Sequence, residues 1–120
     1  LPIPPSVNQA YGNSPNVKGK GRYKTRQYKA WVKAANQMAL CDGLFLHGSR
    51  PFVTGPAKIV IRVPKIRGDI SNRIKVMEDW LVEQGFTDDD QYNLEVTIMV
   101  DMSLGRVNWC EVDISPAGAL

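Results

Sequence analysis

Apolar residues recur along this chain at two different periods, and the longer period predicts a helix over residues 24–40. Its apolar positions lie three or four residues apart and consist of Tyr28, Trp31, Val32, Ala35, Met38 and Ala39. Lysine and arginine occupy the other faces, and Thr25 is the expected N-cap. We therefore expect this stripe, with Trp31 in it, to pack in the core.

A second helical pattern begins at Asp69 and ends before Gly85, which is the expected C′ residue with positive φ. Its apolar stripe consists of Ile70, Ile74, Met77 and Leu81. The acidic turn of residues 88–90 follows. Because a turn after a helix can fold the chain back on its neighbours, the carboxylates of Asp69 and of this turn could converge.

Alternation with a period of two predicts three strands. Residues 56–64 place Ile59, Ile61 and Val63 on one face and Lys58 and Arg62 on the other. That basic face could point toward DNA, or it could keep an edge strand soluble. Residues 92–101 and 106–114 alternate in the same way, and we expect them to form a hairpin with its turn at residues 102–105.

The first 21 residues are rich in Pro, Gly, Asn and Ser. Residues 2–5 should be extended, because proline fixes φ and biases its predecessor away from helix. Residues 11–23 should form a flexible basic loop, in which Tyr11 and Tyr23 could stack on bases, or else an ordinary surface loop. The resulting order is β-α-β-α-β-β: a single α+β domain, residues 1–120, with two helices packed on a small mixed sheet.

Composition narrows the class of protein. The 120 residues are 43% hydrophobic and 22% charged, which is typical of a globular domain, and no apolar run is long enough to span a membrane or direct export. Cys41 and Cys110 lack metal-ligand spacing with each other and with His47, so we expect two buried, reduced thiols in a cytosolic protein. The start at Leu1, without Met, leads us to expect residues before it.

The net charge of +3 hides an asymmetry between the two halves of the chain. Residues 1–67 carry twelve Lys and Arg against Asp42 alone, whereas residues 68–120 carry three against eleven acids. In a nuclease, a basic part follows the phosphate backbone and an acidic part holds a metal ion. The asymmetry favours nucleic-acid binding, although charge runs are also typical of solvated surface.

Two motifs carry a resemblance to a known family. The first is Asp69-Ile70-Ser71-Asn72-Arg73-Ile74-Lys75, followed by Asp79, Leu81, Gly85 and Asp88-Asp89-Asp90-Gln91, and the second is the opening Leu1-Pro2-Ile3-Pro4-Pro5-Ser6-Val7-Asn8. Together they resemble the RusA family of Holliday junction resolvases. That family has Asp-x-Asp-Asn-x-x-Lys-x-x-x-Asp-x-Leu, then Asp-Asp-x-Gln, after an N-terminal Leu-Pro-x-Pro-Pro-Ser-x-Asn. The resemblance implies a Mg²⁺-dependent endodeoxyribonuclease, a homodimer and a bacteriophage or prophage origin.

The resemblance implies a metal site at Asp69, at the position of Ser71 and at Asp89, with Lys75 stabilising charge on the phosphate. Ser71 replaces a usual aspartate, and three alternatives follow. Asp88 or Asp90 could supply the missing ligand, two carboxylates and more water could hold the ion, or the protein could bind junctions and cut them poorly. Mn²⁺ is the alternative ion. DNA contacts are expected from Lys18, Lys20, Arg22, Lys24, Arg67, Asn72 and Arg73.

The same residues have structural alternatives. Asp69 or Ser71 could cap the second helix, and residues 88–90 could be a solvated turn. Lys75 and Asp79 could pair on the helix surface, so that Asp79 orients the lysine rather than contacting metal. Three apolar residues, Trp80, Phe86 and Trp109, could face a partner in a dimer.

The function expected from these observations is structure-selective cleavage of four-way DNA junctions by paired, symmetric nicks, in recombination and repair in the cytoplasm of a bacterial host. A C2 homodimer would match the twofold symmetry of the junction. The alternative is a catalytically weak or inactive branched-DNA-binding protein of the same fold. An enzyme acting on a small phosphorylated molecule fits the metal motif but not the long basic arm.

Overall fold

The structure, a computed structural model, describes residues 1–13, 22–41, 53, 55–88 and 93–117. Its elements in chain order are α1 (Val7–Ala10), β1 (Tyr11–Asn13), β2 (Arg22–Lys24), α2 (Arg26–Cys41), β3 (Ala57–Val63), η1 (Ile70–Arg73), α3 (Ile74–Glu83), β4 (Asn93–Val100), η3 (Met102–Leu104) and β5 (Glu111–Pro116). The elements η1 and η3 are turns of 3₁₀ helix. The predicted α+β fold with a small mixed sheet is confirmed.

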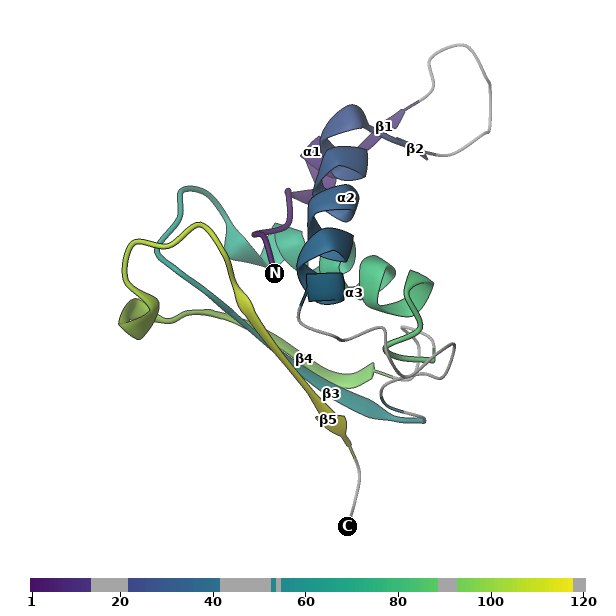
Figure 1. The fold of residues 1–120 in the computed structure, drawn as a ribbon, viewed down its shortest axis with the longest axis vertical. Helices are drawn as coiled ribbons and strands as arrows, with labels where there is room; N and C mark the ends of the chain where they lie inside the picture. Colours follow the sequence, from purple (N-terminus) through teal and green to yellow (C-terminus); the bar gives the residue numbers. More distant parts are fainter. Residues whose placement is uncertain (14–21, 42–52, 54, 89–92, 118–120) are drawn as a thin grey trace.

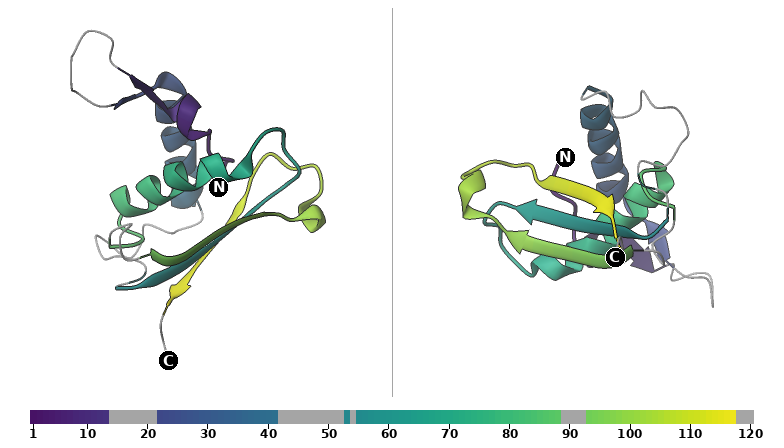
Figure 2. Two further views of the ribbon diagram at one scale, coloured as in Figure 1. Left: turned by 180° about the vertical axis from the view of Figure 1, so that it is seen from behind. Right: turned by 90° about the horizontal axis from the view of Figure 1, so that it is seen from below.

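The three-stranded sheet has the order β4-β3-β5, with β3 parallel to β4 and antiparallel to β5. Helices α2 and α3 lie on the same side of it (Figure 1). The short α1 and the β1–β2 pair lie at the far end of α2, away from the sheet. Figure 2 shows the other face of the sheet, over which no described helix lies. The sheet therefore has a covered face and an open face.

Helix α2 forms as its periodicity predicts. The Thr25 hydroxyl accepts a hydrogen bond from the Tyr28 N–H at 3.2 Å, and the Thr25 carbonyl accepts one from the Lys29 N–H at 3.0 Å, so Thr25 is the N-cap. The buried residues of α2 are Tyr28, Trp31, Ala35 and Ala39. Their spacing of three or four residues forms one face, which packs into the core.

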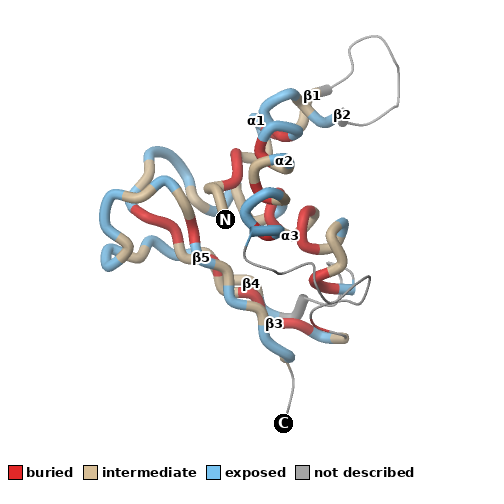
Figure 3. The backbone as a smooth tube through the Cα atoms, in the orientation of Figure 1, coloured by how far each residue is buried: buried red, intermediate tan, exposed pale blue. Residues whose placement is uncertain are grey.

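A row of aromatic rings joins the two long helices. Neighbouring ring centroids lie 5.1 Å apart for Tyr11–Tyr28, 6.3 Å for Tyr28–Trp31, 5.9 Å for Trp31–Trp80 and 5.3 Å for Trp80–Phe86. Trp80 and Phe86 are buried, at 1% and 7% exposed (buried segments are red in Figure 3). The suggestion that these two residues face a dimer partner is therefore wrong, because the core of the monomer needs them; Trp109 alone of the three is partly exposed.

Strand β3 is the centre of the sheet. Its side chains at Ile59, Ile61 and Val63 are fully buried, as predicted, while Lys58 and Arg62 lie on the open face. The alternative of a charged edge strand is wrong, because β3 is paired on both sides. Lys58 pairs with Glu95 at 3.7 Å, and Arg62 donates a hydrogen bond to Asp113. These acids on β4 and β5 neutralise the predicted basic ridge.

The predicted hairpin of the last two strands is wrong. Strands β4 and β5 flank β3 and do not pair with each other. Strand β3, which is fully buried at every second position, is thereby paired with a strand on each side. The chain crosses from one side of β3 to the other through η3 and residues 105–110.

The second helical segment differs from its prediction in register. Its buried residues are Val76, Met77, Trp80 and Leu81, whereas Ile70 and Ile74 are only half-buried. Residues 70–73 form a 3₁₀ turn, which has about 3.0 residues per turn instead of 3.6, so Ile70 does not continue the helical stripe of Met77 and Leu81. Gly85 has the predicted positive φ, at 81°.

The N-terminal residues form more structure than predicted. Pro2 makes a single antiparallel bridge with Trp109 instead of a strand. Ser6 and Gln9 then form a capping box that begins α1. The expected loop of residues 11–23 is wrong at both ends, because β1 pairs with β2; residues 14–21 lie outside the described part.

Two remaining expectations concern cysteines and membrane spans. Cys110 is buried, which raises the pKa of its thiol to about 11, but Cys41 is exposed at the end of α2, so the prediction of two buried thiols holds for Cys110 alone. Both are free thiols. No helix in the described ranges is long and apolar enough to cross a membrane.

Candidate metal and nucleic-acid site

Asp69 lies at the start of η1, after the loop that leaves β3. The loop turns at Gly68, whose φ of 88° suits glycine. The Oδ1 atom of Asp69 accepts hydrogen bonds from the Ser71 N–H at 2.9 Å and from the Ser71 hydroxyl at 2.7 Å. These bonds lower the pKa of the Asp69 carboxyl, so the carboxylate is charged near neutral pH. Asp69 is therefore the N-cap of η1.

A second Asp-x-Ser cap in the same chain has the same geometry. Asp101 begins η3, and its Oδ1 accepts from the Ser103 N–H at 2.9 Å and from the Ser103 hydroxyl at 2.6 Å. The bonds to Ser103 lower the pKa of Asp101 as well. Capping alone therefore accounts for the hydrogen bonds that Asp69 makes. Within the described residues no hydrogen bond or ion pair engages the Oδ2 atom of Asp69, which leaves that oxygen for a further ligand.

The caps predict a pH dependence of stability. Since the carboxyl pKa of Asp101 is lowered in the folded protein, the cap's stabilisation is present above the unfolded pKa and is lost as the pH falls through the folded value. Asp101→Ala should therefore lower the midpoint of urea unfolding at about pH 7 and change it much less at about pH 2. Urea titrations followed by circular dichroism measure this, and an equal loss at both pH values would contradict it.

Lys75 is held by a chain of contacts that reaches the N-terminal region. Its ammonium lies 2.9 Å from Asp79 Oδ1, and the Tyr11 hydroxyl donates to Asp79 Oδ2. Burial, followed by the bond to Asp79, raises the pKa of Tyr11 far above its usual range, so this hydroxyl remains a donor. The surface pair of Lys75 and Asp79 is confirmed. The Tyr11 hydroxyl orients the Asp79 carboxylate, and the Tyr11 ring, which could stack on a base according to the sequence, packs against Tyr28.

Arg73 joins the two sequence motifs. Its guanidinium donates to the Pro4 carbonyl at 2.5 Å, and α1 contacts both η1 and α3. Arg73, a predicted DNA contact, is half-buried, and in the structure its side chain donates the hydrogen bond that holds the opening segment. Asn72, beside it, is exposed. The opening motif and the Asp69 motif are therefore neighbours in space.

Asp88 lies beyond the other end of α3. Its Oδ2 accepts from the Gly55 N–H at 2.6 Å, next to the bridge between Val53 and Thr87. The ten residues of α3 span about 15 Å and separate Asp88 from Asp69; the rear view in Figure 2 follows this helix from end to end. Within one chain, the structure does not bring Asp69 and Asp88 together.

The remaining predicted residues are divided between described and undescribed parts. Asp89, Asp90, Lys18 and Lys20 lie outside the described residues, as does the side chain of Arg22. Lys24 is paired with Glu83 at 2.8 Å, which raises its pKa, and it lies over the Tyr28 ring. Arg67 is exposed. In the described part of the chain, no three His, Cys, Asp or Glu side chains form a group that could hold a metal ion.

Ion pairs reduce the charge asymmetry seen in the sequence. Among the described residues, three pairs join the basic first half to the acidic second half: Lys24–Glu83, Lys58–Glu95 and Arg62–Asp113. Part of the basic half therefore faces protein carboxylates and not solvent. Such partners are distant in sequence, so the charge count could not reveal them.

Comparisons with known proteins add no assignment. No protein-family model matches this chain, and no curated protein matches it. The function is therefore argued from the residues and their geometry.

Proposed function

We propose that this protein is a Mg²⁺-dependent, structure-selective endodeoxyribonuclease that resolves Holliday junctions by paired nicks, as a homodimer in the cytoplasm of a bacterial host. The observation that carries the proposal is the juxtaposition of the two motifs. The Arg73–Pro4 bond holds the opening segment against η1, where the Oδ2 atom of Asp69 has no hydrogen bond or ion pair within the described residues. Lys75 follows in the first turn of α3, with its ammonium oriented by Asp79. A carboxylate and an oriented cation on one exposed helix start suit phosphodiester chemistry.

The residues have distinct roles in this proposal. Asp69 Oδ2 and carboxylates of residues 88–90 would hold the ion, since hard cations prefer oxygen ligands. When bound, Mg²⁺ or Mn²⁺ polarises the phosphate and lowers the pKa of a bound water. Lys75 would bind a phosphate oxygen, and Asp79 with Tyr11 fixes the lysine in place. Ser71 donates to Asp69 and adds no negative charge to the site.

The geometry favours a metal site that is shared between two copies of the chain. Asp69 precedes α3 and Asp88 follows it, and the ten residues of this helix span about 15 Å, so one ion near 2 Å from each ligand is not expected to bind both in one protomer. A twofold partner whose residues 88–90 approach Asp69 would complete the ligand set twice. The two identical sites would then meet two equivalent phosphates of a four-way junction.

One observation favours the alternative of a branched-DNA-binding protein with weak or no cleavage. Asp69 accepts the same hydrogen bonds from Ser71 as Asp101 accepts from Ser103, and Asp101 lies outside both motifs that carry the family resemblance. A metal ion is not needed to explain either carboxylate. The two functions differ in their products, so a cleavage assay separates them.

The test is cleavage of a synthetic mobile four-way junction with Mg²⁺ by three proteins: the unaltered chain, Asp89→Asn and Ser71→Asp. We expect symmetric nicking by the unaltered chain and none by Asp89→Asn. Binding without cutting, restored to cutting by Ser71→Asp, would instead identify a binding protein. Absence of junction binding by all three would reject both functions.

A further inference from the structure

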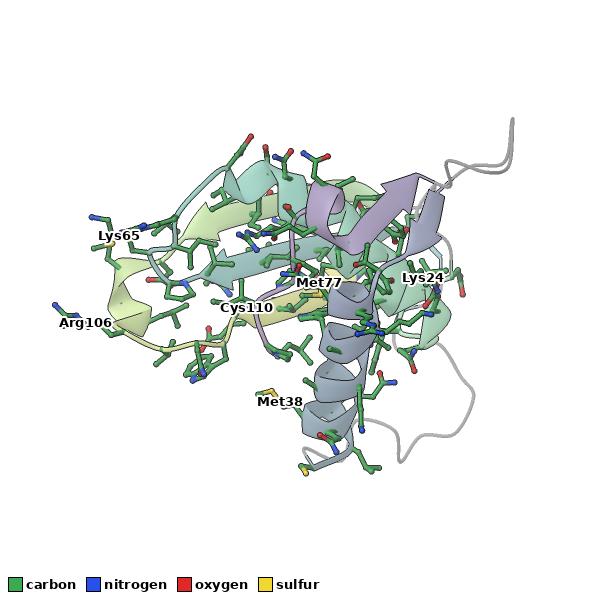
Figure 4. All side chains as sticks on the ribbon, turned by 90° about the horizontal axis from the view of Figure 1, so that it is seen from above. Lys24, Met38, Lys65, Met77, Arg106 and Cys110 are labelled. Atoms are coloured by element: carbon green, nitrogen blue, oxygen red, sulfur yellow. The ribbon has the colours of Figure 1, made fainter. Side chains whose placement is uncertain are left out.

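A cleft lies at the end of the sheet where the chain leaves β3 and returns to β5. Its volume is about 950 Å³, and it is lined by Pro64, Lys65, Met102, Gly105, Arg106, Val107, Asn108 and Trp109. The two cations come from different loops, and Figure 4 shows both side chains at the same end of the molecule, pointing outward. Among the described residues, no acidic side chain lines the cleft. Its size is that of a typical small-ligand pocket.

The two cations of this cleft differ from four others in the described residues, which are neutralised by carboxylates. Lys24, Lys58, Arg62 and Lys75 each have a carboxylate partner within 4 Å. In contrast, neither Lys65 nor Arg106 takes part in an ion pair within the described ranges, and both are exposed. Asp101, the acid that begins η3, is engaged by Ser103. The cleft therefore presents two positive charges to a ligand.

The remaining residues that line the cleft suit the binding of a ligand with a planar ring beside those two charges. Trp109 is partly exposed, and the half-buried Val107 adds apolar surface. The Trp109 backbone is fixed by its bridge to Pro2, and the next residue, Cys110, donates its N–H to the Leu1 carbonyl at 2.7 Å. Asn108 is exposed and offers an amide donor and acceptor. An aromatic surface on a fixed backbone is the usual platform for stacking a nucleobase.

We propose that this cleft binds one nucleotide unit of a single nucleic-acid strand, with its phosphate on Lys65 and Arg106 and its base against Trp109. A nucleotide fits better than an acidic peptide, because two cations, an aromatic ring and an amide line one cavity. The inference deepens the proposed function. Lys65 precedes Asp69 by four residues, which span at most about 14 Å, so the bound unit would lie within a few nucleotides of the strand at Asp69. The cleft would hold a strand that leaves the junction.

Tryptophan fluorescence tests this binding without metal ions and without cleavage. Trp31 and Trp80 are buried, so quenching by an added ligand reports mainly on Trp109. We expect a thymidine oligonucleotide of about six residues to quench the unaltered protein, because base–tryptophan stacking is the main contact. Trp109→Phe should abolish the quenching. The double variant Lys65→Ala/Arg106→Ala should bind at least about tenfold more weakly, with a salt slope lower by about 1.

The controls separate this cleft from general basicity. Lys33→Ala removes an exposed lysine from α2 and should leave the affinity unchanged. Unchanged affinity in the Lys65/Arg106 double variant would overturn the inference, as would equal quenching by a glutamate hexapeptide. If thymidine monophosphate binds as tightly as the oligonucleotide, the ligand is a free nucleotide and the strand assignment fails. Since none of these measurements needs cleavage, the inference and the nuclease proposal fail separately.

Discussion

Trp80→Ala should lower the free energy of unfolding by about 3–5 kcal/mol, the range for a large aromatic residue removed from a core. The side chain is 1% exposed and lies between the rings of Trp31 and Phe86. Its indole N–H also donates to Asn36 Oδ1 at 2.8 Å, so the substitution leaves a partly buried amide oxygen without that partner. Urea unfolding followed by far-ultraviolet circular dichroism measures the loss.

Trp109→Ala is the matched control for this prediction. Trp109 is partly exposed at the rim of a cleft, so its removal creates no closed cavity. We expect it to cost less than half as much as Trp80→Ala. Equal losses for the two variants would mean that the aromatic row does not hold the helices together.

The second large effect is expected on cleavage. Asp69→Asn should reduce nicking of the four-way junction by on the order of a hundredfold or more, as when a group that stabilises transition-state charge is removed. Asparagine is as good an N-cap as aspartate, so the fold should be preserved while the ligand charge is lost. Asp101→Asn makes the same change in the same local geometry and should cut at the rate of the unaltered chain. Equal loss in both variants would assign the effect to capping.

Subunit mixing tests whether the site is shared between protomers. If Asp69 of one copy acts with Asp89 of the other, a heterodimer of Asp69→Asn and Asp89→Asn contains one intact site. Random pairing makes half of the dimers heterodimers, so co-expression should restore about a quarter of the nicking rate. Each inactive variant alone is the control. If both ligands come from one chain, no intact site forms and the mixture stays inactive.

The sequence predicted the elements whose residues are set by local chemistry. Helix α2 follows from its period and from Thr25, and the buried face of β3 follows from strict alternation. Gly85 has a positive φ, as a residue after a helix C-terminus often does. Each of these depends on neighbours within a few positions.

Features that depend on distant residues were not predicted. Alternation in residues 92–101 and 106–114 identified two strands, but not that β3 would lie between them. The 3₁₀ turn at residues 70–73 places Ile70 off the helical stripe, and no local pattern indicates that change of pitch.

In the candidate site, too, contacts between residues close in sequence were predicted and contacts between distant residues were not. The cap at Asp69 and the pair of Lys75 with Asp79 were expected, because both partners lie within four residues of each other. The bond from Tyr11 to Asp79 spans 68 positions and has no signal in a single sequence. The cleft lined by Lys65, Arg106 and Trp109 is formed by two loops that are distant in the sequence, so the sequence of either loop alone does not indicate it.

The first five residues have a consequence for the order in which the protein folds. The carbonyls of Leu1 and Pro2 accept bonds from the Cys110 N–H and the Trp31 indole, and the Pro4 carbonyl accepts from Arg73. The first of these joins residues 109 positions apart. During synthesis on the ribosome, this segment emerges before all three of these partners, and the last of them, Cys110, follows near the end of the described residues. Contacts of such sequence separation form slowly, so this segment is fixed later than the local structure that follows it. Until then the extended prolines keep the segment from collapsing into a helix of its own.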